Sequence, residues 1–436
     1  MFTLKTRKFF EDTSLSIKYI LKWSVLAVMI GVIVGMASVI FKSSLNLGTR
    51  LLASLTETHL VYILPIIGLF MSGLITSTFA SEAAGPGADA IIKAYNENWG
   101  KADIIVVPIR LISSVFTIVF GGSAGMEDPA VHMGGGIASF VGDKLNLKLT
   151  DIQKITICGM SAAFGSIFTV PLAGGVFGPE IIYRDDLDYD NLFISFISSI
   201  TAYFVYAIML GQTRIFNFPV PLEYTFVPTR DILLFIVVGV IVGLTSLLFI
   251  KILHGYEHFS EGLSLPPYFK TALGGVLVGV TALIISPYIL GSGLSLLELI
   301  TIEGKFTTQM LFLMIIGKIV ATSFTLGSGA SGGVVVPSLV VGGLTGAFLA
   351  QVFNFPYPIA LISAGSVGVL GSAAHIPISM TLMAAEVFGM ELIKPATIVC
   401  FIGTWIARND TIYQESYVSR IESLKAPHCY DNFEDK

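Results

Sequence analysis

The chain has 436 residues, of which 54% are hydrophobic and only 13% are charged. Soluble domains carry about twice that charged fraction, so this composition excludes an ordinary soluble protein and predicts a surface that largely faces lipid. The net charge of −5 is small, and the chain contains no nucleic-acid signature, phosphate loop or metal-ligand spacing. We therefore expect no nucleic-acid partner, no metal, no cofactor and no enzymatic activity.

Apolar segments follow one another along the chain. Uncharged runs that reach the ~20 residues needed to cross the hydrocarbon core lie at Trp23–Phe41, Leu60–Ser81, Ile232–Ile250 and Thr271–Leu297, and residues 319–385 contain no Asp, Glu, Lys or Arg. We expect an all-α polytopic protein of the cell membrane, with one transmembrane domain over 1–436 and roughly ten to fourteen membrane segments.

Basic residues flank the outermost apolar segments. Lys5, Arg7, Lys8, Lys18 and Lys22 precede the first, and Arg408, Arg420 and Lys425 follow the last. By the positive-inside rule, both termini are expected on the cytoplasmic side. The first apolar run is too long for a cleavable signal, and no small-residue cleavage site follows it.

An internal repeat is visible at a spacing of about 206 residues. The motif Gly125-x3-Pro129-x4-Gly134-Gly135 recurs as Gly333-x3-Pro337-x4-Gly342-Gly343. Further matched pairs are Gly85 with Gly291, Arg110 with Lys318, Gly159 with Gly365, Pro171 with Pro377, and Glu180 with Glu386. We predict two structural repeats, over about 17–215 and about 228–407, inverted as repeats in transporters commonly are.

Glycine and proline interrupt the apolar pattern at 85–87, 121–129 and 327–337. Irregular backbone at membrane depth is tolerated only where protein or water covers it, so these stretches predict tilted and broken helices that meet inside the protein. The N–H groups and partial positive charge of a helix N-terminus suit a small anion and allow its release. For the glycines at 134–136, close helix packing is an equally good interpretation.

Glu127 is the ionisable residue that we expect to act as a gate. It stands at a predicted helix start inside an apolar region, and ionisable groups at membrane depth usually have a function. As a carboxylate it could occupy the anion site, and once protonated it could swing away. The alternative is that an acid here only caps the helix, a role that suits the neighbouring Asp128.

These motifs resemble those of the CLC family of chloride channels and proton/chloride exchangers over roughly residues 20–420. The family's Gly-Ser-Gly-Ile-Pro matches Gly85-Pro86-Gly87-Ala88-Asp89, its Gly-Arg-Glu-Gly-Pro matches Gly125-Met126-Glu127-Asp128-Pro129, and its Gly-x-Phe-x-Pro matches Gly333-Val334-Val335-Val336-Pro337. The family's tyrosine near the start of the last helix matches Tyr413.

The resemblance implies a homodimer with one pore in each subunit and no C-terminal regulatory domain. It implies an anion, chloride first of all, held by the N–H groups of Val334 and Val335, the Tyr413 hydroxyl and the Pro86–Gly87 loop. Gly85, Gly125, Gly333 and Pro337 would shape that site. Glu127 would be the external gate, protons a further partner, and a last helix over about 411–425 would line the pore.

The chain departs from the family pattern at several places, among them Met126, which stands where the family has arginine. Three further departures bear on the anion and on proton coupling. Pro86 replaces the family serine, as in relatives that resemble nitrate-preferring exchangers, whereas fluoride exporters of the family have methionine there. Asp128 replaces a glycine, and a second carboxylate would raise the proton affinity of Glu127. Ile181 stands where proton-coupled members have an inner glutamate. The adjacent Glu180 matches Glu386 in the other repeat, so we interpret it as a structural residue and not as that inner glutamate.

Three alternatives remain open at this stage. One is a fluoride exporter of the same family. A second is a sodium-coupled transporter of an organic substrate, which could also use inverted repeats and broken helices. The third is an intramembrane serine protease, because Gly329-Ala-Ser331-Gly332 fits the Gly-x-Ser-Gly motif of rhomboids and His375 follows in an apolar stretch.

Overall fold

The computed structural model describes residues 2–56, 58–211, 224–302 and 305–423, and these residues form helices joined by short loops and isolated β-bridges. The first-half helices are α1 (Phe2–Thr56), α2 (Leu64–Phe79), α3 (Gly87–Glu97), α4 (Val106–Val119), α5 (Glu127–Lys144), α6 (Leu149–Ile167), α7 (Pro171–Ile181) and α8 (Tyr189–Leu210). The others are α9 (Pro228–Glu261), α10 (Pro267–Ile284), α11 (Leu294–Leu299), α12 (Thr308–Leu326), α13 (Val335–Val352), α14 (Pro358–Ala374), α15 (Pro377–Val387), α16 (Ile393–Ile406) and α17 (Arg420–Ser423).

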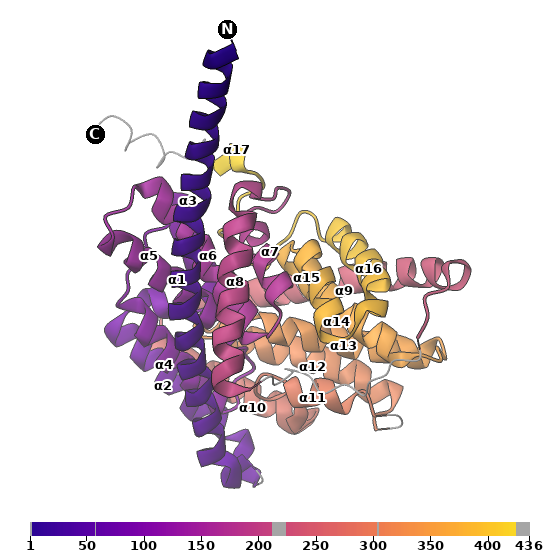
Figure 1. The fold of residues 1–436 in the computed structure, drawn as a ribbon. Helices are drawn as coiled ribbons and strands as arrows, with labels where there is room; N and C mark the ends of the chain where they lie inside the picture. Colours follow the sequence, from indigo (N-terminus) through magenta and orange to yellow (C-terminus); the bar gives the residue numbers. More distant parts are fainter. Residues whose placement is uncertain (1, 57, 212–223, 303–304, 424–436) are drawn as a thin grey trace.

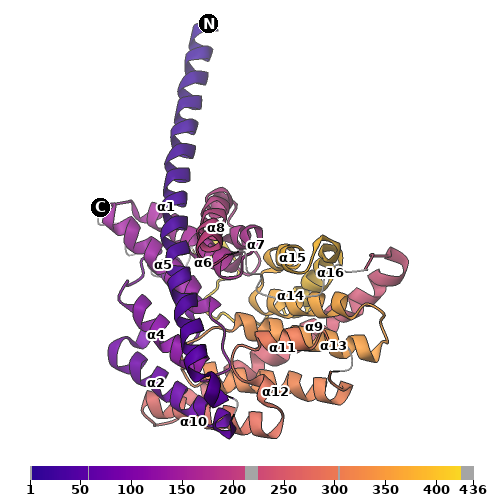
Figure 2. The same cartoon turned by 60° about the horizontal axis from the view of Figure 1, so that its bottom comes forward.

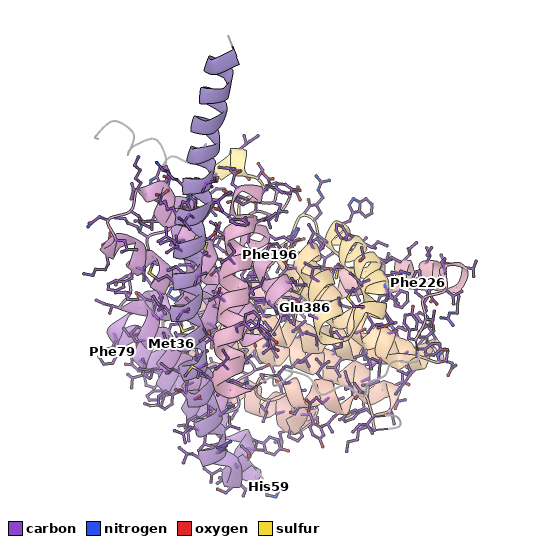
Figure 3. The ribbon with its side chains drawn as sticks, viewed as in Figure 1. Met36, His59, Phe79, Phe196, Phe226 and Glu386 are labelled. Carbon is purple, nitrogen blue, oxygen red and sulfur yellow. The ribbon has the colours of Figure 1, made fainter. Side chains whose placement is uncertain are left out.

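Many of these helices are apolar enough to lie in a membrane. Among the described residues, 6 helices are long and apolar enough to cross one, by length and composition, and four shorter apolar helices accompany them. Large apolar side chains such as Met36 (41% exposed) and Phe79 (68% exposed) face outward (Figure 3). An exposed apolar surface of this kind needs lipid around it, so the protein is membrane-embedded and multi-pass.

The repeat seen in the sequence is also a repeat in space. Helices α4 to α7 recur in order as α12 to α15, and the two sets lie side by side (Figures 1 and 2). Unusual backbone conformations recur with them. Gly85 (φ +66°) corresponds to Gly291 (φ +62°), and Thr169 (φ 57°) corresponds to His375 (φ 58°). Non-glycine residues seldom adopt positive φ, so these matched turns support the repeat independently of sequence identity.

Two buried cations anchor equivalent loops in the two halves. The Arg110 guanidinium on α4 donates hydrogen bonds to the carbonyl groups of Gly85 (3.0 Å) and Glu82. Lys318 on α12 donates from Nζ to the carbonyl oxygen of Gly291 at 2.7 Å. Both side chains are fully buried, where a cation needs such partners. Arg110 and Lys318, which the sequence predicts to be equivalent, therefore have the same role. Each is a buried cation that holds the glycine loop of its own half.

Helices α7 and α15 cap each other across the boundary between the halves. The Glu386 carboxylate on α15 accepts hydrogen bonds from the N–H groups of Leu172 and Ala173 at the start of α7, both at 2.9 Å. Glu180 on α7 accepts them from Ile378 (2.8 Å) and Ser379 (2.7 Å) at the start of α15. Each of these acids lies near the C-terminal end of its own helix and caps the N-terminus of the other helix. Helices α7 and α15 therefore run in opposite directions, as inverted repeats require. Figure 3 labels Glu386 at this boundary.

The glycines of the repeated motif allow two helix pairs to approach closely. A Cβ atom added to Gly134 on α5 would lie 2.2 Å from the carbonyl oxygen of Gly159 on α6. A Cβ atom added to Gly342 on α13 would lie 2.1 Å from the carbonyl oxygen of Gly365 on α14. For these positions the interpretation as close helix packing is correct.

The helix predicted over about 411–425 is not present in the described part of that range. Residues 411–419 form turns, bends and one isolated bridge, and the helical part of the predicted range is the single turn of α17. Their backbone groups pair with other segments instead. The Ile412 N–H bonds to the Ala373 carbonyl at 2.8 Å, and the N–H groups of Arg184 and Asp185 bond to the carbonyl groups of Tyr417 and Val418, both at 3.0 Å. Residues 424 and 425 lie outside the described residues.

We expect Gly342→Ala to destabilise the protein by about 1–3 kcal/mol, the usual cost of overpacking, because the new methyl group would collide with the Gly365 backbone. Gly255→Ala on α9 is the matched control, since an added Cβ there meets nothing within 4 Å and alanine favours the helix by about 0.5–1 kcal/mol. Thermal unfolding in detergent measures both. Equal melting temperatures for the two variants would contradict the packing described here.

Candidate functional site

In the described part of the chain, the N-termini of α3, α5 and α13 meet in the interior of the protein. Two loops pair there as an antiparallel bridge in which the Gly125 N–H donates to the Gly333 carbonyl oxygen at 2.7 Å. The loop before α3 joins them through a parallel bridge between Pro86 and Gly332. The breaks predicted at 85–87, 121–129 and 327–337 therefore come together at one place.

The site-shaping glycines are needed because these loops lie in contact. A Cβ atom on Gly87 would lie 2.4 Å from the Asp128 carbonyl oxygen, and one on Gly333 would lie 3.0 Å from the Asp128 nitrogen. Gly125 would carry its Cβ 2.2 Å from a Glu127 carboxylate oxygen, and Gly85 has a positive φ. Pro337 is the third residue of α13, in the first turn, where a missing N–H costs no helical hydrogen bond.

Asp128 occupies the centre of this meeting point. Its Oδ2 atom accepts a hydrogen bond from the Val334 N–H at the start of α13, and its Oδ1 atom accepts one from the Tyr413 hydroxyl, each at 2.7 Å. Asp128 is fully buried and Tyr413 is 1% exposed. Two donors that come from different segments thus converge on a single carboxylate.

Glu127 lies beside Asp128 without comparable contacts. It is 1% exposed, and within the described residues neither of its carboxylate oxygens has a hydrogen-bond partner. Lys42 of α1 approaches this region, with its Nζ 3.7 Å from the Met126 sulfur. The Val336 N–H and the Lys42 ammonium act on this carboxylate electrostatically. A buried acid without a hydrogen bond is nevertheless costly, so Glu127 is held less firmly than Asp128.

A cavity with several polar side chains in its wall lies near Pro86. A space of about 320 Å³ is lined by residues that include Gly85, Glu257, Lys270 and Ser328. A smaller space of about 10 Å³, lined partly by Pro86, Asp89 and Glu257, lies next to it and shares Glu257, Leu326 and Gly327 as walls. About 10 Å³ is close to the minimum that holds one water molecule.

The predicted site residues are therefore brought together. Val334 and Tyr413 provide converging donors, Val335 begins α13 in a fully buried position, and Pro86 and Gly87 form the start of α3. Asp128 was interpreted from sequence as a helix cap, and its central position was missed. The sequence does contain a signal for this position, because Asp128 is a second carboxylate where the CLC motif has glycine.

The residues of the protease alternative do not pair. The Ser331 hydroxyl is 2.9 Å from the Ser114 hydroxyl, and the His375 Nε2 atom is 3.0 Å from the Asp410 carbonyl oxygen. Among the described residues no serine–histidine pair forms at Ser331, so this geometry does not support a serine nucleophile activated by His375.

The fold and the site together define a multi-pass membrane protein with two inverted repeats and a buried polar centre between them. The chain belongs to the voltage gated chloride channel family, whose model matches residues 67–408.

Individual relatives extend this likeness over most of the chain. It is 32% identical to the uncharacterized protein MJ0305 of Methanocaldococcus jannaschii, covering 91% of this chain and 95% of that protein. It is 31% identical to a chloride/fluoride channel protein of Pseudomonas syringae pv. tomato, covering 92% and 87% respectively. The crystal structure of a CLC-type fluoride/proton antiporter has the same fold, with a TM-score of 0.81 at 23% identity over 92% of this chain and 98% of that one.

Proposed function

We propose that the protein transports small inorganic anions, chloride first of all, across the cell membrane through the site between α3, α5 and α13. The observation that carries this proposal is the convergence of the Val334 N–H and the Tyr413 hydroxyl on one buried, negatively charged group. Donors that hold a carboxylate can hold a small anion in its place. Neutral donors and helix N-termini also bind it weakly enough for release.

We propose Glu127 as the gate of this path. Its carboxylate is buried at the N-terminus of α5 beside Asp128 and has no hydrogen-bond partner among the described residues. As an anion it can compete with the transported ion for the positive end of the helix. Protonation removes that competition, which couples the opening of the path to pH.

The proposal also covers the oligomeric state and the side of the membrane on which the termini lie. We propose a homodimer with one pore in each subunit, as the resemblance to the family implies, and both termini in the cytoplasm, as the basic flanking residues favour. The proposal includes no catalytic reaction and no cofactor. Transport could be channel-like or linked to protons, because Ile181 stands at the place of the family's inner glutamate.

Fluoride export is a second candidate. The relative from Pseudomonas syringae is named a chloride/fluoride channel protein, and it is 31% identical to this chain. Pro86, in contrast, is neither the serine of the family motif nor the methionine of its fluoride exporters, so the sequence of this loop favours neither anion.

The experiment is anion flux from liposomes that contain the purified full chain. Reversal potentials under crossed gradients of pH and of chloride, nitrate or fluoride rank the three anions and measure proton coupling together. We expect selective anion movement that does not require sodium. Leakage no faster than in protein-free liposomes, for all three anions, would contradict the proposed function.

We expect Glu127→Gln to weaken the pH dependence of anion flux and to raise flux at neutral pH, because glutamine keeps the shape of the side chain but cannot ionise. Flux is measured in liposomes from acidic to neutral pH. Glu391→Gln is the control, since Glu391 is an exposed glutamate outside the site, and it should leave the profile unchanged. A Glu127→Gln profile identical to wild type would rule out this gate.

We expect Pro86→Ser to shift selectivity from nitrate toward chloride, because a serine at this helix start adds a hydroxyl donor beside the site. Serine is also a favoured N-cap residue, so the variant should fold. The permeability ratio of nitrate to chloride is the measurement. Pro266→Ser, at the exposed start of α10, serves as control, and an unchanged ratio in Pro86→Ser would show that residue 86 does not line the anion path.

A further inference from the structure

The hydrogen bonds of Asp128 do not fit a residue that only caps its own helix. A capping acid accepts from the first N–H groups of the helix it begins. Asp128 is the second residue of α5, yet its oxygens accept from Val334 and Tyr413, which are 206 and 285 residues further along the chain. Its carboxylate is therefore directed away from α5 and into the space between the two halves.

The two donors that hold Asp128 are the ones through which we propose that an anion binds. Both bonds are 2.7 Å long, short enough to hold the carboxylate in place. A transported anion needs these same donors, and they cannot serve it and the carboxylate together. The family motif has glycine at this position, which could not reach them.

We propose that Asp128 is a second gate, whose carboxylate fills the central anion position as a tethered substitute and must leave Val334 and Tyr413 before an anion binds there. This inference rests on the proposed function and makes it more specific. Glu127 and Asp128 then have different roles in gating. Glu127 has no hydrogen bond among the described residues to break when it moves, whereas Asp128 is anchored by two and competes directly with the anion.

Protonation offers one way to release Asp128. A proton on either oxygen removes the negative charge and leaves the carboxyl group with less capacity to accept hydrogen bonds, so the attraction of the two donors for Asp128 weakens. The groups that act on Asp128 are Glu127 on the same helix, Asp89 on α3, Arg110 on α4, and Tyr413. Helix α13 contributes no titratable side chain. Anion binding in the wild type should therefore strengthen as the pH falls.

Simple competition gives the size of the effect. The apparent dissociation constant equals the intrinsic constant divided by the fraction of protein whose site is free. If the carboxylate fills the site in all but about one molecule in ten, removing it tightens apparent binding by about tenfold. A more complete occupancy gives a larger change.

The test is calorimetric titration of chloride into the purified full chain in detergent, near neutral pH and at acidic pH, together with chloride flux from liposomes. We expect Asp128→Gly to bind chloride at least about tenfold more tightly than wild type near neutral pH, with a weaker pH dependence. Asp128→Asn keeps the shape without the charge, and it should also bind more tightly. It supplies the test if the glycine variant does not fold.

Asp143→Gly is the matched control, because Asp143 lies on the same helix with a side chain that is 65% exposed, and its chloride binding should equal that of wild type. If both Asp128 variants bind chloride no more tightly than wild type while all the proteins transport it, the second gate is overturned and the proposed function stands. If no variant binds or moves chloride, nitrate or fluoride, the proposed function fails and the second gate with it.

Discussion

The pairing of Gly125 with Gly333 is the interaction on which the rest of the structure depends. Irregular backbone inside a membrane protein must find partners within the protein, and here each half provides the partner for the other. That pairing brings the starts of α5 and α13 together and directs their N–H groups at one place. The inverted repeat is the simplest way to supply two such breaks, because it presents the same motif from opposite directions.

No full positive charge donates a hydrogen bond to the two central acids within the described residues. Arg110 and Lys318 are both buried, but they donate to loop carbonyl groups, and Arg110 and Lys42 act on Asp128 and Glu127 only from a distance. The centre itself is made of backbone N–H groups, a tyrosine hydroxyl and two acids. Such a site compensates negative charge through many partial charges, and this suits an ion that must bind and then leave. We propose that its own acids control when the site is open.

Much of this was predictable from sequence because it depends on glycine and proline, whose backbone requirements are local. The repeat and the three breaks rest on such residues, and the correspondence between Arg110 and Lys318 follows from the register of the repeat. The course of residues 411–419 was not predictable, because their backbone bonds to Ala373, Arg184 and Asp185, which are far away in sequence. The position of Asp128 was missed for the same reason, since its partners lie on other segments.

The central claim is that one anion position lies between the Val334 N–H and the Tyr413 hydroxyl. Anomalous diffraction from crystals of the Asp128→Gly protein grown in bromide tests it most directly, because bromide replaces chloride and is located without reference to any assumed site. The account predicts an anomalous peak within hydrogen-bond distance of both donors. A bromide-soaked crystal with strong peaks elsewhere and none between Val334 and Tyr413 would contradict it.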